Sequence, residues 1–167
     1  MLQKRFWLFI IAAAVVLTAA AAVIFDIANR GTRLVICDRD TDKVYASFDV
    51  ESGEEFSISF IHSVNITEVT DVYYADGETI VCNKCIYSSF GAGMPTEWEE
   101  DWQVSYEGEK MTISGLDIRQ KEVTYIVGTV YDHVLHLGGE DIVLNELCGK
   151  NAEITLKIKT SFFGRCR

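Results

Sequence analysis

FSISFIHSV at residues 56–64 and TEVTDVYYA at residues 67–75 form the pair of segments that decides the fold. Apolar and polar side chains alternate along both segments, and this period of two predicts β-strands. If His62 lies opposite Asp71, the apolar partners of the resulting hairpin all fall on one face. The Asp76-Gly77 dipeptide then predicts a type I′ turn into a third strand. The sequence therefore predicts three adjacent antiparallel strands that share a buried face.

The same alternation continues on both sides of this hairpin, from about Gly31 to the end of the chain. Turn residues separate the strand-like runs, and no stretch after residue 30 has the pattern of a long amphipathic helix. About 9–11 short strands predict an all-β fold, an antiparallel sandwich or barrel. The chain is therefore expected to divide into an anchor at residues 1–30 and a β domain at residues 31–167.

The N-terminal segment is apolar over Phe6–Phe25 and contains no charged residue. A helix of that length spans roughly 30 Å, the thickness of the hydrocarbon core of a bilayer. Lys4 and Arg5 precede it, so the positive-inside rule places the N-terminus in the cytoplasm and residues 31–167 outside. The prediction is one uncleaved transmembrane helix, which makes the chain a single-pass protein of the cell membrane. A cleaved signal peptide is the alternative, because small residues follow Leu17 at plausible cleavage positions.

The charge of the chain restricts its partners. The formal net charge is −10; Lys4 and Arg5 contribute +2, and Asp26 and Arg30 cancel, so residues 31–167 carry −12. Phosphate backbones repel such a domain, which argues against nucleic acid as a partner. Cations, basic proteins or a membrane neighbour are the expected partners.

The predicted register places His62, Asp71 and Cys82 in one row on the apolar face of three strands. A buried histidine and carboxylate often only satisfy each other's hydrogen bonds, and a cysteine in a strand is usually a small apolar residue. The same residue types also form metal sites and thiol nucleophiles. The sequence leaves these interpretations open.

CNKC at residues 82–85 has the spacing of a redox C-x-x-C motif. In an extended strand, however, Cys82 and Cys85 point to opposite faces with their Cα atoms about 10 Å apart, beyond the reach of a disulfide. The strand prediction therefore excludes a Cys82–Cys85 disulfide. The chain has five cysteines in all, an odd number that leaves at least one thiol free. No sequence motif indicates a cofactor or a metal, and none is predicted.

FGAGMP at residues 90–95 interrupts the strand pattern and contains the only proline of the chain. Gly91 and Gly93 can adopt positive φ, and successive amides in such a turn can form a concave anion-binding nest. Pro95 fixes φ and prevents the chain from entering another strand at once. The loop is predicted to be a recognition element, with a tight crossover between sheets as the alternative.

Four features follow one another along the chain. They are FSISFIHSV, an acidic residue nine positions after the histidine of that segment, SSFGAGMPT at residues 88–96, and DHVLHL at residues 132–137. With them the chain resembles domain-of-unknown-function family 1850 over about residues 33–158. The family consists of small bacterial and archaeal proteins, many with an N-terminal membrane segment. Their genes commonly lie beside permease genes of TRAP transporters that use TAXI-type solute receptors.

The resemblance implies a binding site but no activity, since the family has none established. The implied site residues are His62, Ser63, Asp71, Phe90, Gly91, Ala92, Gly93, Met94, Pro95 and His133, and the family pattern also falls on Val64 and Tyr73.

The expected function is that of a membrane-anchored extracytoplasmic recognition domain, an accessory of a TRAP-type (TAXI) solute uptake system. Its expected partner is the permease, the solute receptor or an anionic solute. The alternative is a metal-dependent or thiol hydrolase that uses His62, Asp71 and His133, with or without Cys82. A third possibility is a structural surface domain without a site.

Overall fold

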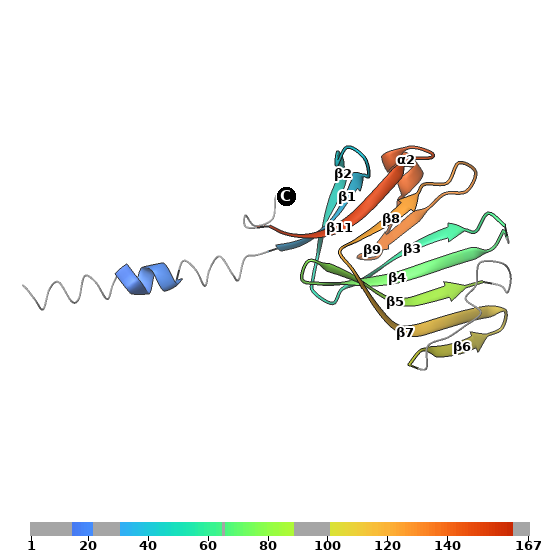
Figure 1. The fold of residues 1–167 in the computed structure, drawn as a ribbon, viewed down its shortest axis with the longest axis horizontal. Coiled ribbons are helices and arrows are strands. Elements are labelled where there is room, and N and C mark those ends of the chain that lie inside the picture. Colours follow the sequence, from blue (N-terminus) through green and yellow to red (C-terminus); the bar gives the residue numbers. More distant parts are fainter. Residues whose placement is uncertain (1–14, 22–30, 65, 89–100, 162–167) are drawn as a thin grey trace, which may run out of the picture. The chain divides into compact units, whose positions relative to one another are not determined.

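The computed structural model describes residues 15–21, 31–64, 66–88 and 101–161 (Figure 1). Residues 15–21, which belong to the predicted anchor, are helical. In the described ranges, no helix is long and apolar enough to cross a membrane. The predicted recognition loop, Phe90–Pro95, lies outside the described residues.

The described part of the β domain contains eleven strands and one short helix. The strands are β1 (Gly31–Asp38), β2 (Val44–Val50), β3 (Glu55–Ile61), β4 (Glu68–Asp76), β5 (Thr79–Tyr87), β6 (Gln103–Glu107), β7 (Lys110–Gln120), β8 (Glu122–Ile126), β9 (Val134–Leu137), β10 (Glu140–Val143) and β11 (Glu153–Ser161). The helix α2 (Leu144–Cys148) directly follows β10 and is only five residues long, consistent with the expectation that no long amphipathic helix follows residue 30. The all-β fold class is confirmed.

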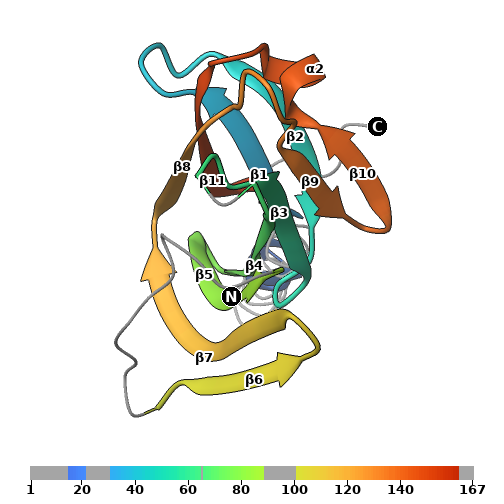
Figure 2. The same ribbon diagram turned by 90° about the vertical axis from the view of Figure 1, so that its right-hand side faces the viewer.

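The strands form two sheets. One has the order β10-β9-β3-β4-β5-β7-β6, and the other has the order β2-β1-β11-β8. Figure 2 shows β6 and β10 at the two ends of the larger sheet. Only Lys121 separates β7 from β8, so the chain passes from one sheet to the other within a single residue. The hairpins of the larger sheet are antiparallel, as predicted.

The inner faces of the two sheets share one apolar core. Leu34 and Leu156 enter it from the four-stranded sheet, while Phe56, Ile58 and Met111 enter it from the seven-stranded sheet. Burial of each such side chain contributes roughly 1.5–3 kcal/mol to folding. Two sheets packed over a common core make the domain a β-sandwich.

The β3–β4 hairpin has a different register from the predicted one. Ile58, not His62, lies opposite Asp71, and Phe60 lies opposite Val69. The displacement is four residues, an even number, so every side chain keeps its predicted face while its partner changes. The loop fixes the register: the His62 N–H donates to the Thr67 carbonyl at 2.9 Å.

The β4–β5 turn also differs from the prediction. The two loop residues are Gly77 and Glu78, so that Asp76 lies opposite Thr79. Gly77 has a positive φ of +60° at the first loop position and Glu78 does not have a positive φ, which is the pattern of a type II′ turn. The sequence predicted an Asp76-Gly77 turn of type I′. This places Cys82 opposite Tyr73 rather than opposite Asp71. The predicted row of His62, Asp71 and Cys82 is therefore wrong.

Candidate functional site

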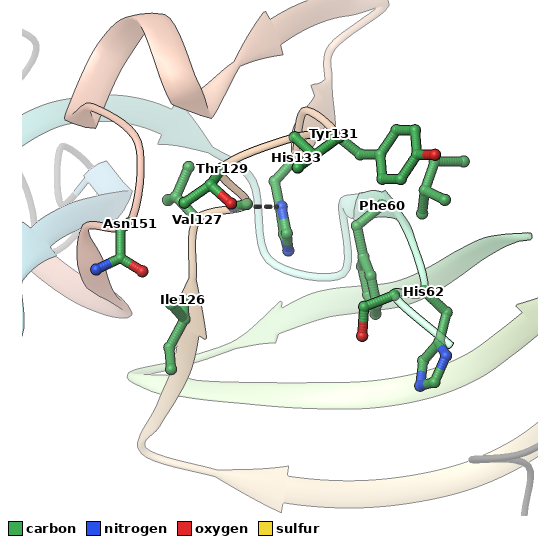
Figure 3. A pocket seen from close by; sticks show the side chains of 12 residues that line it. Phe60, His62, Ile126, Val127, Thr129, Tyr131, His133 and Asn151 are labelled. Carbon is green, nitrogen blue, oxygen red and sulfur yellow. Dashed lines mark hydrogen bonds between the residues drawn. The ribbon is translucent and has the colours of Figure 1, made fainter. Parts of the chain in front are cut away.

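A pocket of about 460 Å³ lies between the end of β3 and the loop that joins β8 to β9. Its residues are Phe60, Ile61, His62 and Ser63 from the first segment, Ile126, Val127, Gly128, Thr129, Val130, Tyr131 and His133 from the second, and Asn151. We call it the His133 pocket (Figure 3). Its volume is in the range of small-molecule sites, roughly 300–1,000 Å³.

The loop that carries His133 is held by hydrogen bonds around Gly128. The Gly128 N–H donates to Nδ1 of His133 at 3.1 Å, and Nδ2 of Asn145 donates to the Gly128 carbonyl at 2.9 Å. The His133 N–H in turn donates to Oδ1 of Asn145 at 3.2 Å. A Cβ atom at position 128 would lie 2.2 Å from the Tyr131 carbonyl oxygen. Glycine is therefore required at this position.

His133 presents a neutral ring with one donor to the pocket. Its Nδ1 accepts the Gly128 N–H, so the ring proton of the neutral form is on Nε2. The ring stacks on Phe60 at 5.0 Å between centroids and meets the edge of Tyr125 at 6.1 Å. Burial lowers the pKa of His133 below 6.5, although the nearby Asp132 charge opposes the shift. In Figure 3 the ring points into the space between Ile126 and the Phe60 side of the pocket.

His62 lies on the side of the pocket opposite Ile126 in Figure 3. Ser63, the next residue in the loop that follows β3, also lines the pocket. Val64 donates its N–H to Nδ1 of His62 at 3.4 Å, a weak bond that leaves the imidazole Nε2 for other partners. The structure thus brings His62, Ser63 and His133, three of the predicted site residues, to one pocket.

Asp71, also a predicted site residue, does not line the His133 pocket. Its Oδ2 accepts a hydrogen bond from the Tyr125 hydroxyl at 2.7 Å, and its Oδ1 accepts one from the Cys85 thiol at 3.2 Å. The Tyr73 and Tyr125 hydroxyl oxygens are 2.6 Å apart. Because Tyr125 uses its proton on Asp71, Tyr73 is the donor in that second bond. Burial, as the largest cause, raises the pKa of both tyrosines, which keeps them protonated.

Cys82 and Cys85 lie on the same face of β5, which contradicts the prediction that they point to opposite faces. The register of β5 against β4 shifts between Cys82 and Lys84, so Asn83 is an extra residue in the strand. Cys82 consequently lies opposite Tyr73, Cys85 lies opposite Asp71, and the two sulfur atoms are 4.0 Å apart. A β-bulge of this kind inverts the alternation beyond it, and no residue type at position 83 signals it.

A third polar group occurs on the outer face of the seven-stranded sheet. Nε2 of His136 lies 2.8 Å from the Ser59 hydroxyl, and Nδ1 of the same ring lies 2.6 Å from Oδ1 of Asp141. Strand pairing creates the row, because His136 and Asp141 are directly opposed on β9 and β10. No sequence pattern predicted this row of side chains, although the alternation did place Ser59 on the polar face of its strand.

No cluster of three histidine, cysteine or acidic side chains is arranged to hold a metal ion in the ranges that the structure describes. The predicted site residues Phe90, Gly91, Ala92, Gly93, Met94 and Pro95 lie outside those ranges.

The geometry defines an all-β sandwich domain with a partly open, largely apolar pocket and two further polar clusters. The family model described as "Domain of unknown function (DUF1850)" matches residues 56–144, more than half of the chain, so the protein belongs to this family. The matched range includes both histidines of the pocket and all members of the two polar clusters. No curated protein and no solved structure matches the chain.

The state of His133 predicts a pH dependence of stability. Its pKa in the folded chain is below the value of 6.5 that applies when it is unfolded, so the unfolded chain takes up the proton first as the pH falls. This contribution is complete above pH 6.5 and is lost as the pH decreases through the window below 6.5. Protonation of Nδ1 would also break the bond from Gly128. Between pH 7.5 and pH 5.5, the free energy of unfolding measured with urea should decrease less for His133→Phe than for the wild type.

His62→Gln is the matched control, because it removes an imidazole from the same pocket but leaves the Gly128 bond intact. If the stability of His133→Phe decreases with falling pH as steeply as that of the wild type, His133 is not the group responsible for the pH dependence.

Proposed function

We propose that this protein is a membrane-anchored extracytoplasmic recognition domain and that the His133 pocket is its binding site. The observation that carries the proposal is a neutral His133 whose Nε2–H points into an otherwise largely apolar cavity. A preformed apolar pocket with a few fixed polar groups is the usual form of a small-molecule site. The hydrogen bonds of Asn145 to Gly128 and His133 hold that donor in place before any ligand arrives.

The donors of the pocket select the class of ligand. Nε2 of His133 donates in the neutral form, and the Ser63 hydroxyl can donate as well. Phe60, Ile126 and Val127 provide an apolar wall. The pocket therefore suits a molecule with an apolar body and an acceptor oxygen, either a carboxylate or a carbonyl group. A ligand without such an oxygen would leave the His133 donor unpaired, which costs about 1–3 kcal/mol.

The proposals of a membrane anchor and of a transporter partner are based on the sequence. The uncharged segment Phe6–Phe25 supports an anchor with residues 31–167 outside the cell. The family resemblance supports an association with a TRAP permease or a TAXI-type solute receptor. In this proposal the domain presents its pocket to the transporter component or to its solute.

A hydrolase is the second candidate. The observation that favours it is the row Ser59–His136–Asp141, in which a hydroxyl, an imidazole and a carboxylate are joined in the order that activates a serine nucleophile. The set His62, Asp71 and His133 has less support, because the described contacts of Asp71 are to Tyr125 and Cys85. Ser59 is only 7% exposed, which argues against an open active site.

The ligand class can be tested with three probes of matched chain length: hexanoate, hexanamide and hexylamine. NMR titration should show that hexanoate or hexanamide shifts the His133 ring signals, because each offers an acceptor oxygen, and that hexylamine does not. His133→Phe should weaken binding by about tenfold, equivalent to one hydrogen bond. His136→Gln, on the outer face, is the control. Binding of hexylamine alone would show that charge, not the His133 donor, selects the ligand.

The transporter association can be tested by co-purification from membranes of the native host. A tagged wild-type chain should retain a TRAP permease or a TAXI-type receptor, identified by mass spectrometry, and His133→Phe should retain less of it. Circular dichroism should confirm that the variant is folded. Recovery of neither component with the wild type would remove the transporter from the proposal, while the binding test of the pocket would stand.

The hydrolase candidate can be tested with a fluorophosphonate, which reacts with activated serine hydroxyls. A catalytic Ser59 should become labelled in the folded chain, and Ser59→Ala or His136→Gln should abolish the label. Ser57→Ala is the matched control, because Ser57 lies on the same face of β3 and directly opposite His136. Absence of labelling at Ser59 would eliminate this candidate.

A further inference from the structure

Cys82 and Cys85 are the two cysteines whose sulfur atoms are in contact among the described residues, at 4.0 Å. Cys37 and Cys148, the other described cysteines, are also free thiols. A disulfide needs the two sulfur atoms at about 2.05 Å, so the pair has to close by roughly 2 Å. Both side chains project from the same face of one strand, so the two sulfur atoms already lie next to each other.

The backbone around the two cysteines is irregular on both sides of β5. The register shifts between Cys82 and Lys84 against both β4 and β7. On β7 the matching segment contains Gly115 at φ +76° and Asp117 at φ +42°. Bulges re-aim side chains and occur frequently beside functional sites. Here the bulge produces the arrangement that an ordinary strand would prevent, two thiols at C-x-x-C spacing in contact.

A proton acceptor lies next to the pair. The Cys85 thiol donates to Oδ1 of Asp71 at 3.2 Å, and the Tyr125 hydroxyl holds the other carboxylate oxygen at 2.7 Å. Cys85 is half-buried, whereas Cys82 is 6% exposed. Cys85 is therefore the more exposed residue of the pair, and the Cys82 sulfur in contact with it is placed to resolve a mixed disulfide.

We propose that Cys82 and Cys85 form a redox-active dithiol that exchanges with low-molecular-weight disulfides, with Asp71 as the acceptor of the Cys85 proton. This site is independent of the recognition function of the His133 pocket. Its substrate is a small disulfide R–S–S–R, which is the oxidant of the reaction.

The exchange takes place in two steps. In the first step, the Cys85 proton passes to Asp71 while the Cys85 sulfur attacks one sulfur of R–S–S–R. The bond between Cys85 and that sulfur forms as the S–S bond of the small disulfide breaks. The departing thiolate takes the proton from Asp71 and leaves as R–SH. The Cys82 sulfur then attacks Sγ of Cys85, which forms the protein disulfide and releases a second R–SH with the proton of Cys82. The two protein thiols lose two electrons and two protons, and the small disulfide gains them.

The test is a redox titration of the full chain in buffers of oxidised and reduced glutathione. After an acid quench, the chain is unfolded, blocked with N-ethylmaleimide and cleaved after glutamate, which isolates Cys82 and Cys85 on one peptide between Glu78 and Glu97. In oxidised glutathione this peptide should lose two hydrogen atoms and take up no label. Reduced glutathione should reverse the change, and Cys37 and Cys148 should take up label throughout.

Asp71→Asn should slow formation of the disulfide by about 100-fold, the effect of removing a general base. Asp76→Asn, at the exposed end of the same strand, is the matched control and should react at the wild-type rate. The proposal is overturned if the folded wild-type chain keeps both thiols in oxidised glutathione, or if either cysteine bonds to a different cysteine. If Asp71→Asn does not fold, the wild-type titration still decides the outcome.

Discussion

The hydrogen bond from the Tyr125 hydroxyl to the Asp71 carboxylate, at 2.7 Å, is the interaction on which the organisation of this domain depends. Tyr125 belongs to the four-stranded sheet and Asp71 to the seven-stranded sheet, so the bond joins the two layers of the sandwich. A carboxylate on the inner face of a sheet is tolerated only if its oxygens are satisfied. Tyr125 and Cys85 provide one donor to each oxygen.

The same tyrosine connects the polar cluster to the His133 pocket. While its hydroxyl is bound to Asp71, its ring meets the rings of Phe60 and His133 at 6.1 Å between centroids in both cases. The position of the His133 ring thus depends on two supports, the Gly128 loop on one side and the aromatic cluster on the other. Removal of the Tyr125 ring would affect both the pocket and the packing of the two sheets.

The sequence predicted the faces of β3, of β4 and of β5 as far as Cys82, but not the partners of these strands. Alternation assigned Phe60, Asp71 and Cys82 correctly to the inner face, yet an even displacement of the register leaves every face unchanged, so alternation alone cannot detect it. The bulge at Asn83 could not be predicted, since it results from tertiary pairing on both sides of β5. Three predicted site residues, His62, Ser63 and His133, do meet in one pocket, although no sequence pattern predicted the Gly128 hydrogen bond that positions His133.

The three candidate sites, namely the His133 pocket, the cluster around Asp71 and Cys85, and the row Ser59–His136–Asp141, differ in how the backbone positions their side chains. His133 stands on a loop that only glycine at position 128 permits, and Cys85 stands beyond a bulge, so both side chains are placed by departures from regular pairing. Ser59 instead stands on β3, which is paired on one side by β4 and on the other by β9. Pairing on both sides commits the N–H groups of a strand to the ladder, so they cannot stabilise an oxyanion beside the serine. The regular strand pairing that aligns Ser59 with His136 therefore also makes Ser59 the weakest candidate for chemistry. The stronger candidates are His133 and Cys85, which stand at irregular positions of the backbone.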